Sequence, residues 1–343
     1  MPIKKLHKEL CLPDHGGDLI YAKNYFGEPN HPWVDLSTGI NPRSYPFSFI
    51  KNEKYQKLPS QNDISKLLEI ARNYYQTPDQ VDIIAGPGSQ FFLQTLPLFL
   101  QEYKNISILT PTYNEYAKCW GSKNSKITYV KKITELKRDQ QILIICNPNN
   151  PNGAIIDHNV ILDTAQFLKK NKGILIIDEA FVDPIPEYSI VPLLHHSNII
   201  VLKSFGKFFG LAGLRLGFMI SAHPVIQQIN HFLGPWPISH PAIEIGIKAF
   251  NDKVWINKTK NWLQITSKKI HSVFQTYNFK QYKGTALFTF INDSRAFSLY
   301  QCLGKKGIYT RIYKENPSWI RIGMPLPQTF KRLTKALSLW NEY

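Results

Sequence analysis

The feature that most constrains the fold of this chain is an alternation of short β-branched runs with helical stretches between residues 80 and 221. Each run ends in a turn rich in Gly, Pro, Asn or Asp, and such alternation is typical of an α/β domain with a mostly parallel sheet. Ligands of such sheets bind beyond the carboxyl ends of the strands. Catalytic and ligand-binding residues are therefore expected just after each run. The runs that we interpret as strands are Val81–Ala85, Ile106–Thr110, Gln141–Cys146, Ile174–Asp178, Ile199–Leu202 and Phe218–Ser221.

The pattern changes character after Leu233. A proline-broken stretch, residues 234–241, leads into long helical patterns, and a hairpin-like region, a further helix and a last strand follow. At about 100 to 200 residues per domain, the 343 residues suggest two domains. We therefore expect a large domain at 35–235 and a smaller α+β domain at 236–343. Residues 1–34 have no partner pattern of their own, and we expect them to form an N-terminal arm packed with the small domain.

The composition is that of an ordinary globular protein, because 43% of the residues are hydrophobic and 19% are charged. No apolar run approaches the roughly 18 residues of a membrane span. The segment from Met1 to Asp14 mixes charged residues with few apolar ones, so we expect no signal-peptide core there. We therefore expect a cytoplasmic protein with no membrane partner. The cysteines have no paired spacing, which favours reduced thiols over a disulfide framework or a zinc site, and they are Cys11, Cys119, Cys146 and Cys302.

The formal net charge is +16, from 41 Lys and Arg against 25 Asp and Glu. Such an excess can indicate a nucleic-acid partner or an anionic substrate. The basic residues are scattered through the chain, in pairs such as Lys131 with Lys132 and Lys305 with Lys306, and they never form a block of five or six. Scattered lysines are typical of a solvated surface, so we expect no nucleic-acid partner.

The strongest chemical motif is the stretch 202–218, LKSFGKFFGLAGLRLGF. Lys207 lies in a turn rich in Ser and Gly after a strand, where an amine can be held as a Schiff-base nucleophile. Ser204 and Arg215 add a hydroxyl and a guanidinium for a phosphate. This combination suggests pyridoxal phosphate as the cofactor. The alternative is a surface lysine in a loop, beside an arginine that caps neighbouring carbonyl groups.

Two further strand ends carry residues that also fit a pyridoxal-phosphate site. Asp178 ends a buried apolar run, and a carboxylate there can pair with a protonated pyridine nitrogen and keep the ring an electron sink. Its alternative role is an ordinary helix N-cap. Asn150 lies in the turn rich in Asn and Pro after Cys146, where its amide can project toward a phenolic oxygen. Without its neighbours this segment is an unremarkable turn.

Two more segments carry residues that fit the same cofactor site. Residues 85–90, AGPGSQ, precede a helical stretch, and backbone N–H groups at a helix N-terminus favour a phosphate. Tyr113 follows the strand that begins at Ile106 and offers an aromatic face for stacking. Each signal is weak alone, but several in this order are far more specific than any one.

In this order the motifs resemble the fold-type I pyridoxal-phosphate enzymes of the histidinol-phosphate aminotransferase kind, over nearly the whole chain. Within that group the sequence is most similar to the cobalamin-pathway branch, the threonine-phosphate decarboxylases. Further cues are His15-Gly-Gly17, the segment from Trp33 to Pro42, and the stretches 233–239 and 284–288. The resemblance implies an α/β fold-type I transferase that has a large domain with a mostly parallel, seven-stranded-type sheet and a smaller C-terminal α+β domain, assembled as a homodimer.

The resemblance also implies how pyridoxal 5'-phosphate is held. Lys207 would be the Schiff-base lysine, Asp178 the partner of the pyridine nitrogen, and Asn150 the donor to the phenolic oxygen. Tyr113 would stack on the ring. The residues implied to hold the cofactor phosphate are Gly88, Ser89, Gln90, Ser204 and Arg215.

The implied substrate is a small phosphorylated amino acid. Arg321 would bind its α-carboxylate, and Asn41 and Asn150 would also contact it. For its phosphate we expect His15 and Arg311. Strand-like runs beside Arg311 and Arg321 can project these two arginines into the cleft between the domains. The alternatives are a local turn residue at His15 and a surface charge at Arg311.

Four departures from the family pattern stand out. Phe181 occupies the place of a tyrosine that bonds the phenolic oxygen in many related aminotransferases. Asn152 replaces the usual Thr after Asn-Pro, and Pro87 removes one backbone donor from the phosphate turn. Leu58-Pro59 stands where relatives carry a Tyr-Pro pair that reaches the cofactor of a partner subunit.

The implied reaction is decarboxylation of L-threonine O-3-phosphate to (R)-1-aminopropan-2-ol phosphate. The same residues can serve loss of CO2 or loss of the α-hydrogen, because the orientation of the Cα bonds selects which one breaks. An aminotransferase of the histidinol-phosphate type therefore stays open. A catalytically dead binding module is a third possibility, and the joint retention of Lys207, Asp178, Asn150 and Arg215 argues against it.

Overall fold

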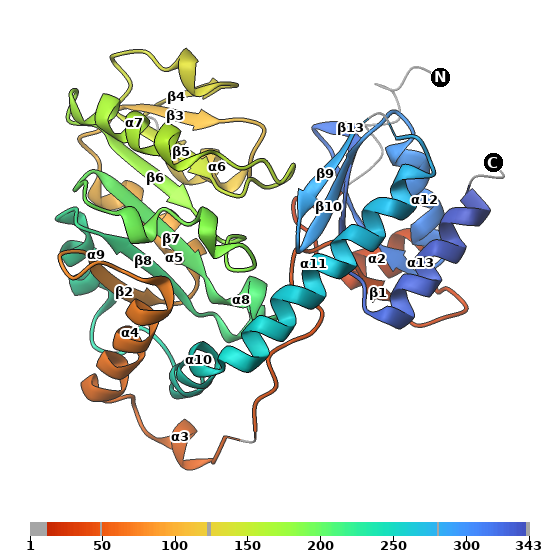
Figure 1. Cartoon of the computed structure of the whole chain (residues 1–343), viewed down its shortest axis with the longest axis horizontal. Helices are drawn as coiled ribbons and strands as arrows, with labels where there is room; N and C mark the ends of the chain where they lie inside the picture. The colour runs from red at the N-terminus through yellow and green to blue at the C-terminus, as the bar shows by residue number, and fades with distance from the viewer. Residues whose placement is uncertain (1–11, 49, 122–124, 280, 341–343) are drawn as a thin grey trace. The chain divides into compact units, whose positions relative to one another are not determined.

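The computed structural model describes residues 12–48, 50–121, 125–279 and 281–340. Cys11 lies outside these residues, and the described cysteines, Cys119, Cys146 and Cys302, are free thiols. The chain divides into two compact units, whose elements are labelled in Figure 1. Unit 1 is the described part of Met1–Arg43 together with that of Asn261–Tyr343, and unit 2 is Ser44–Lys260.

Unit 2 is built on a seven-stranded sheet with the strand order β2-β8-β7-β6-β5-β3-β4. Its strands are β2 (Asp82–Gly86), β3 (Asn105–Leu109), β4 (Lys126–Val130), β5 (Ile142–Cys146), β6 (Ile174–Asp178), β7 (Ile199–Ser204) and β8 (Gly217–Ser221). Strands β4, β3, β5, β6 and β7 pair in parallel, whereas β8 runs antiparallel to both of its neighbours. The predicted mostly parallel sheet is thus confirmed.

The buried centre of the sheet explains why six of its strands could be predicted. Every residue of β5, β6 and β8 is buried, so these strands appear in the sequence as continuous apolar runs. Strand β4 was not predicted. It pairs at the edge of the sheet, where its side chains are mostly exposed or half-buried, so it lacks that apolar signal.

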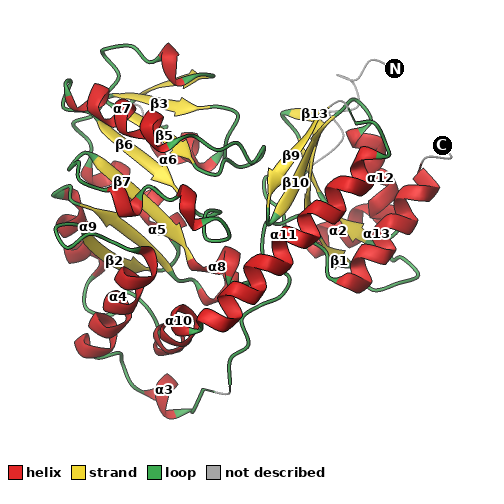
Figure 2. Cartoon of the chain, in the orientation of Figure 1, coloured by secondary structure: helices red, strands yellow, loops and turns green. Residues whose placement is uncertain are grey.

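The helices of unit 2 alternate with most of its strands along the chain and are red in Figure 2. They are α3 (Glu53–Gln56), α4 (Gln61–Tyr75), α5 (Ser89–Phe99), α6 (Glu115–Trp120), α7 (His158–Lys169), α8 (Phe205–Phe208), α9 (Val225–Leu233) and α10 (His240–Asn251). Among the predicted site residues, Ser89, Gln90 and Lys207 lie on helices. The longer helix α11 (Lys253–Gln275) carries the chain from unit 2 into unit 1. Of the helices in the described ranges, none is long and apolar enough to cross a bilayer.

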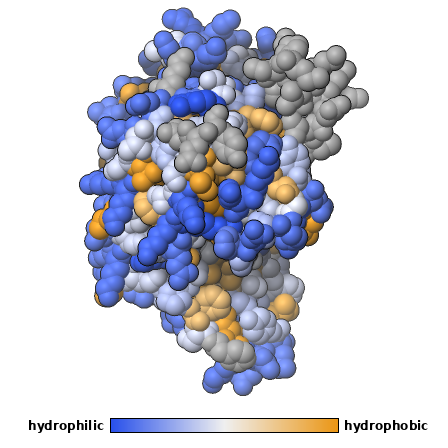
Figure 3. All heavy atoms as spheres, turned by 90° about the vertical axis from the view of Figure 1, so that its right-hand side faces the viewer, coloured by the Kyte–Doolittle hydropathy of each residue, from blue (hydrophilic) through white to orange (hydrophobic). Residues whose placement is uncertain are grey.

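Unit 1 is a smaller α+β unit. Its main sheet is antiparallel, with the order β12-β13-β10-β9, and a separate parallel pair joins β1 to β11. The strands are β1 (Val34–Asp35), β9 (Gln281–Thr285), β10 (Phe288–Asn292), β11 (Ile308–Tyr309), β12 (Arg311–Tyr313) and β13 (Asn316–Gly323). The helices are α2 (Leu19–Phe26), α12 (Ala296–Lys305) and α13 (Pro327–Trp340). The face in Figure 3 is mostly hydrophilic, with small groups of apolar residues among the polar ones.

The unit boundaries lie later in the chain than the sequence patterns suggested. They fall at 43/44 and 260/261, against the expected 34/35 and 235/236. At the first boundary, β1 pairs with β11, which holds residues 34 and 35 in unit 1. At the second, α10 packs against α4 of unit 2. Both differences arise from contacts between residues far apart in the sequence, which a scan for local composition does not detect.

Candidate active site

The predicted site residues fall into two groups, one in each unit. The group in unit 2 contains the residues predicted to hold the cofactor, and they are Gly88, Ser89, Gln90, Tyr113, Asn150, Asp178, Ser204, Lys207 and Arg215. The group in unit 1 contains the remaining residues predicted to bind the substrate, and they are His15, Asn41, Arg311 and Arg321.

Lys207 lies on α8, immediately after β7, and its side chain is half-buried. Its Nζ stands 5.7 Å from the centre of the Phe181 ring. Phe181 is itself buried, so the ring forms an apolar wall beside the amine. The neighbouring Lys203 differs sharply, because it is 1% exposed and its Nζ lies 2.5 Å from Oε2 of Glu179. Of these two lysines, only Lys207 is open to a ligand.

Asp178 is the last residue of β6 and is buried. Burial raises the pKa of its carboxyl group, while the hydrogen bond from Tyr116, the N–H of Ala180 and the charge of Lys207 act to lower it. The hydroxyl of Tyr116 donates to Oδ2 at 2.8 Å, and the N–H of Ala180 donates to Oδ1 at 2.9 Å. The second bond caps a turn and not a helix, because among the described residues the next helix after Asp178 is η2 (Pro186–Tyr188). The expected alternative of a helix N-cap is therefore wrong, and the local turn bond is compatible with the cofactor role. A buried carboxylate beside a lysine is suited to holding a cationic ring nitrogen.

The turn between β2 and α5 forms a cradle for an anion. Gly88 has φ +83°, and a Cβ on it would lie 2.7 Å from Nη2 of Arg215. Only glycine therefore lets this backbone approach the guanidinium. A Cβ on Gly217 would lie 2.4 Å from the backbone nitrogen of Ser89, so a second glycine lets β8 approach the start of α5. The N-terminus of an eleven-residue helix and a guanidinium thus meet, which fits a phosphate.

Arg215 is held in a left-handed conformation with φ +54°. This region is unfavourable for residues other than glycine, and such strain is found at binding sites. Its Nη2 donates to the carbonyl oxygen of Pro87 at 3.4 Å. Pro87 has no backbone N–H, but its carbonyl group still helps to hold Arg215. Ser204 ends β7, and its side chain does not cap α8. The Arg215 guanidinium thus lies beside Gly88 in the cradle.

The turn after β5 is built by its asparagines. Asn149 donates from Nδ2 to the carbonyl oxygen of Pro111 at 2.7 Å and to Oδ1 of Asn152 at 2.8 Å. Asn152 also accepts from the N–H of Ala154. The residue that replaces the family's Thr therefore stabilises the turn with its amide. Asn150 lies next to this framework and is half-buried.

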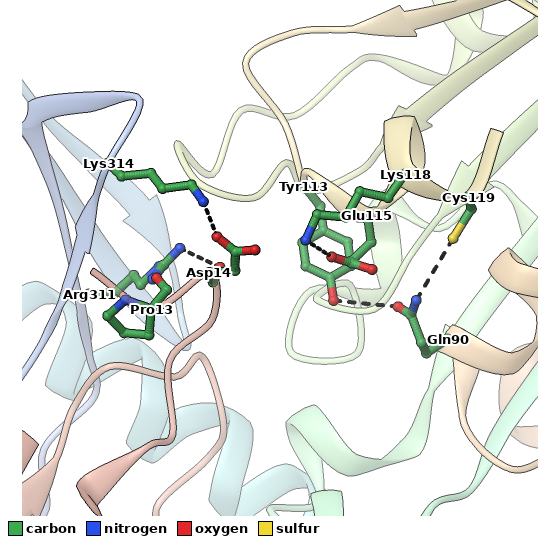
Figure 4. Close-up of polar contacts among 9 residues, drawn as sticks. All are labelled: Pro13, Asp14, Gln90, Tyr113, Glu115, Lys118, Cys119, Arg311 and Lys314. Carbon is green, nitrogen blue, oxygen red and sulfur yellow. Dashed lines mark hydrogen bonds and ion pairs between the residues drawn. The ribbon is translucent and has the colours of Figure 1, made fainter. Parts of the chain in front are cut away.

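Tyr113 follows β3 and is joined to the phosphate turn. Its hydroxyl donates to Oε1 of Gln90 at 3.4 Å, and Nε2 of Gln90 lies 4.0 Å from Sγ of Cys119, as Figure 4 shows. Burial raises the pKa of Tyr113 to about 12, so its hydroxyl stays protonated and remains a donor. The structure therefore brings together residues from three separate strand ends of unit 2.

In unit 1, two buried arginines stand directly opposite each other. Arg311 on β12 and Arg321 on β13 are cross-strand neighbours and are 5% and 8% exposed. Like charges at such positions repel, and burial lowers the pKa of Arg311, with Arg321 lowering it further. The guanidinium carbons lie 5.0 Å from the Tyr313 ring and 5.2 Å from the Phe288 ring, respectively. A site that confines two cations in this way is suited to a ligand with two anionic groups.

The segment around His15 is fixed against the loop after β1. The N–H of Gly17 donates to Oγ of Ser37 at 2.7 Å, and the carbonyl oxygen of Ser37 accepts from Nη2 of Arg321 at 2.9 Å. A Cβ on Gly16 would lie 2.5 Å from that carbonyl oxygen, which explains the glycine. Asn41, farther along the same loop, is buried and accepts from the N–H of Arg43 at 3.0 Å.

Arg311 also holds this segment. Its guanidinium donates to the carbonyl oxygens of Pro13 and Asp14, and the Asp14 carboxylate pairs with Lys314, as the left half of Figure 4 shows. His15 follows directly and is exposed. Arg311 therefore holds the segment that carries His15, and Arg321 holds the loop that carries Asn41. The bond from Gly17 to Ser37 joins that segment to that loop.

Two features of unit 2 escaped the sequence analysis. One is Tyr116 on α6, which contacts Asp178, and the signal for it in the sequence is its position three residues after Tyr113. The other is the buried group of Glu179, Lys203 and Ser189. Lys203 donates to Ser189 Oγ at 3.0 Å, and that hydroxyl donates to Oε2 of Glu179 at 2.6 Å. Nothing in the local sequence links residues so far apart.

Asp183 is buried and yields a prediction on how the stability of the fold depends on pH. Burial raises its pKa from 3.8 to about 6, and Oδ2 has no hydrogen-bond partner among the described residues. Between these pH values the folded chain holds a proton that the unfolded chain has lost. The free energy of unfolding should therefore fall as pH rises through this window, by about 3 kcal/mol at most.

Asp183→Asn removes the ionisation. We expect its melting temperature to exceed that of the unchanged protein at about pH 7.5, and the difference to disappear near pH 4. Thermal unfolding of both proteins across this range measures it. A difference that does not vary with pH would contradict the assignment.

Comparisons with known proteins agree with this architecture. A family model for aminotransferase class I and II matches residues 52–337. A threonine-phosphate decarboxylase from Sinorhizobium sp. is 33% identical over 328 residues, which cover 94% of this chain and 97% of that protein. A histidinol-phosphate aminotransferase 1 from Legionella pneumophila is 30% identical over 267 residues, which cover 71% of this chain and 70% of that protein.

A solved structure extends the comparison to the fold. The histidinol-phosphate aminotransferase from Sinorhizobium meliloti, in complex with pyridoxal-5'-phosphate, superposes with a TM-score of 0.78 at 17% identity, covering 99% of this chain and 97% of that one. The predicted fold-type I architecture is confirmed. The family match also spans the strand ends that carry Asp178, Lys207 and Arg215. The chain therefore belongs to the aminotransferase class I and II family.

Proposed function

We propose that this chain is a pyridoxal-phosphate-dependent decarboxylase of L-threonine O-3-phosphate that forms (R)-1-aminopropan-2-ol phosphate, as in cobalamin synthesis. The observation that carries the proposal is the pair of buried arginines, Arg311 and Arg321, opposite each other in unit 1. Threonine phosphate carries a carboxylate and a phosphate on one small molecule. The 33% identity to a threonine-phosphate decarboxylase, over 97% of that protein, supports the same substrate.

Unit 2 holds the cofactor in this proposal. When bound, pyridoxal phosphate supplies an electron sink for the bond that breaks at Cα. The amine of Lys207 attaches the cofactor and later moves a proton at Cα. The Asp178 carboxylate keeps a proton on the pyridine nitrogen, and Asn150 donates to the phenolic oxygen. Tyr113 would stack on the ring. The residues that would hold the cofactor phosphate are Gly88, Ser89, Gln90, Ser204 and Arg215.

Unit 1 holds the two anionic ends of the substrate. Arg321 binds the carboxylate, with Asn41 beside it, and this keeps the scissile Cα bond in one orientation. Arg311 and His15 bind the phosphate, because a phosphate that carries about −1.5 to −2 charge needs more than one donor. A guanidinium has five N–H groups, so Arg311 keeps donors for a ligand beyond those that hold Pro13 and Asp14.

The second candidate function is an aminotransferase of the histidinol-phosphate type. It is favoured by the 30% identity to a histidinol-phosphate aminotransferase. Histidinol phosphate carries a phosphate but no carboxylate, so in its own half-reaction one of the two opposed arginines would have no anion, whereas threonine phosphate supplies an anion for each. This difference favours threonine phosphate for a site with two buried guanidinium groups.

Incubation of the pure protein with threonine phosphate tests the proposal. We expect release of CO2 and accumulation of aminopropanol phosphate without any added keto acid. Histidinol phosphate with 2-oxoglutarate should give little product in a parallel assay. Formation of a keto acid from threonine phosphate, or efficient conversion of histidinol phosphate, would favour the aminotransferase instead.

The two arginines are distinguishable by kinetics. We expect Arg311→Ala to lower kcat/KM for threonine phosphate by about 10- to 100-fold, since hydrogen bonds to charged groups are among the strongest, while the feeble reaction with threonine changes little. Arg321→Ala should impair both substrates. Lys314→Ala is the matched control, because Lys314 is a nearby exposed cation that pairs with Asp14. An equal loss for both substrates in Arg311→Ala would contradict its phosphate role.

We also propose a cytoplasmic homodimer. The free thiols at Cys119, Cys146 and Cys302 suit a reducing compartment. The segment before α4 exposes the large apolar side chains of Phe47, Tyr55 and Leu58, which an interface would cover. Equilibrium sedimentation of the protein tests this, and a monomer at micromolar concentration would contradict it.

A further inference from the structure

A buried tyrosine of unit 2 contacts a residue of the proposed site. Tyr116 on α6 is 0% exposed, and its hydroxyl donates to Oδ2 of Asp178 at 2.8 Å. The N–H of Ala180 donates to the other oxygen, Oδ1, at 2.9 Å. Each carboxylate oxygen thus has one partner and keeps a second lone pair for another donor.

The Tyr116 hydrogen bond opposes the effect of burial on the charge of Asp178. Burial raises the pKa of this carboxyl group, and Glu179 raises it further. The hydrogen bond from Tyr116 is the first of the effects that lower the pKa, ahead of the N–H of Ala180 and the charge of Lys207. Burial also raises the pKa of Tyr116 well above its ordinary value, so its hydroxyl remains a donor at neutral pH.

We infer that Tyr116 is a positioning residue that keeps the Asp178 carboxylate ionised and oriented, so that the proton shared with the cofactor stays on the pyridine nitrogen. The inference rests on the proposed function, in which Asp178 pairs with that nitrogen. Without the hydroxyl, the carboxylate becomes a stronger base and draws the proton away from the ring. The ring then withdraws fewer electrons from Cα.

The ring of Tyr116 has a separate packing role, which a phenylalanine would preserve. It meets the Tyr113 ring edge-on, with centroids 5.6 Å apart and planes at 86°. Tyr116→Phe therefore removes the hydrogen bond and leaves this aromatic contact. This distinction separates the electrostatic role of the residue from its role in packing.

The test is nitrogen-15 NMR of the holoenzyme carrying cofactor labelled at the pyridine nitrogen. We expect the unchanged enzyme to give the resonance of a protonated nitrogen. Tyr116→Phe should move that resonance toward the neutral position, with the proton equilibrium shifted about 10- to 100-fold, since charged hydrogen bonds have this strength. kcat for threonine phosphate should fall by a similar factor while KM changes little.

Tyr75→Phe is the matched control. Tyr75 is a buried tyrosine of the same unit, and its hydroxyl has no hydrogen-bond partner among the residues that the structure describes. This variant should keep the resonance and kcat of the unchanged enzyme. An unshifted resonance in Tyr116→Phe, or an equal shift in both variants, would overturn the inference. Thermal unfolding of both variants verifies that each is folded.

A different result would count against the proposed function instead. If the nitrogen of the unchanged enzyme is unprotonated, or if Asp178→Asn leaves its resonance in place, then Asp178 does not pair with the ring. The pairing assumed for Asp178 would then be wrong, whatever Tyr116→Phe does. The two failures are therefore distinguishable within one series of spectra.

Discussion

Lys207→Ala is expected to abolish turnover of threonine phosphate. The side chain is half-buried beside Phe181 at the end of β7, and it is the lysine of this turn that is open to a ligand. Removal of its amine takes away both the attachment of the cofactor and the group that moves the proton at Cα. Steady-state assays and the absorbance of the purified variant measure the effect, and the yellow colour that borohydride bleaches should be lost.

Lys203 provides the contrast, because it lies only four positions earlier in the same strand and turn. Its amine is bound to Glu179 and Ser189 and is buried, so it should stay unmodified. Lys207→Arg is a second control, since it retains the positive charge but cannot attach the cofactor. Peptide mapping after reduction should place the adduct on Lys207 alone. A reducible yellow Lys207→Ala protein with the adduct on Lys203 would contradict the assignment.

The large sheet was predictable because its central strands are buried on both faces. A strand such as β5, with every residue buried, must be apolar throughout, and that leaves a continuous run in the sequence. Strand β4 lies at the edge and half in solvent, so its sequence is free to alternate. The strands that the sequence predicts are thus those whose residues must be apolar because they are buried.

The cofactor half of the site was predictable for a topological reason. Parallel strands end at one edge of a sheet, so residues that follow separate strands in the chain meet in space. Asp178 after β6 and Lys207 after β7 are such residues, and β6 and β7 are neighbours in the sheet. Their chemistry could therefore be combined before any coordinates were known.

The contact of Tyr116 with Asp178 and the pairing of the two arginines could not be predicted in this way, because both depend on tertiary contacts. Tyr116 lies on a helix and reaches Asp178 through packing, and helical position alone does not indicate which strand end a side chain meets. Arg311 and Arg321 are ten residues apart in the chain (321 − 311 = 10), and only the register of β12 with β13 places them directly opposite. Register depends on turn geometry and packing that the sequence does not state.

Asp178→Asn is expected to lower turnover by orders of magnitude while the protein stays folded. An amide carries no charge, so it cannot hold a proton on the pyridine nitrogen, and the ring loses much of its electron-withdrawing power. Folding should survive because burial already opposes ionisation of Asp178, and the amide oxygen can still accept one of the two hydrogen bonds. The affinity for the cofactor should fall less than kcat, because the phosphate cradle and Lys207 are unchanged.

Asp157→Asn is the matched control for the alternative in which Asp178 only caps the turn that follows it. Asp157 caps α7 and accepts from the N–H of Asn159 at 2.8 Å, two residues ahead, just as Asp178 accepts from Ala180. If capping were the whole role of Asp178, the two substitutions would have similar, small effects on stability and none on turnover. We expect Asp157→Asn to keep full kcat, whereas Asp178→Asn should lose it. Near-normal turnover in Asp178→Asn would show that this carboxylate is only a cap.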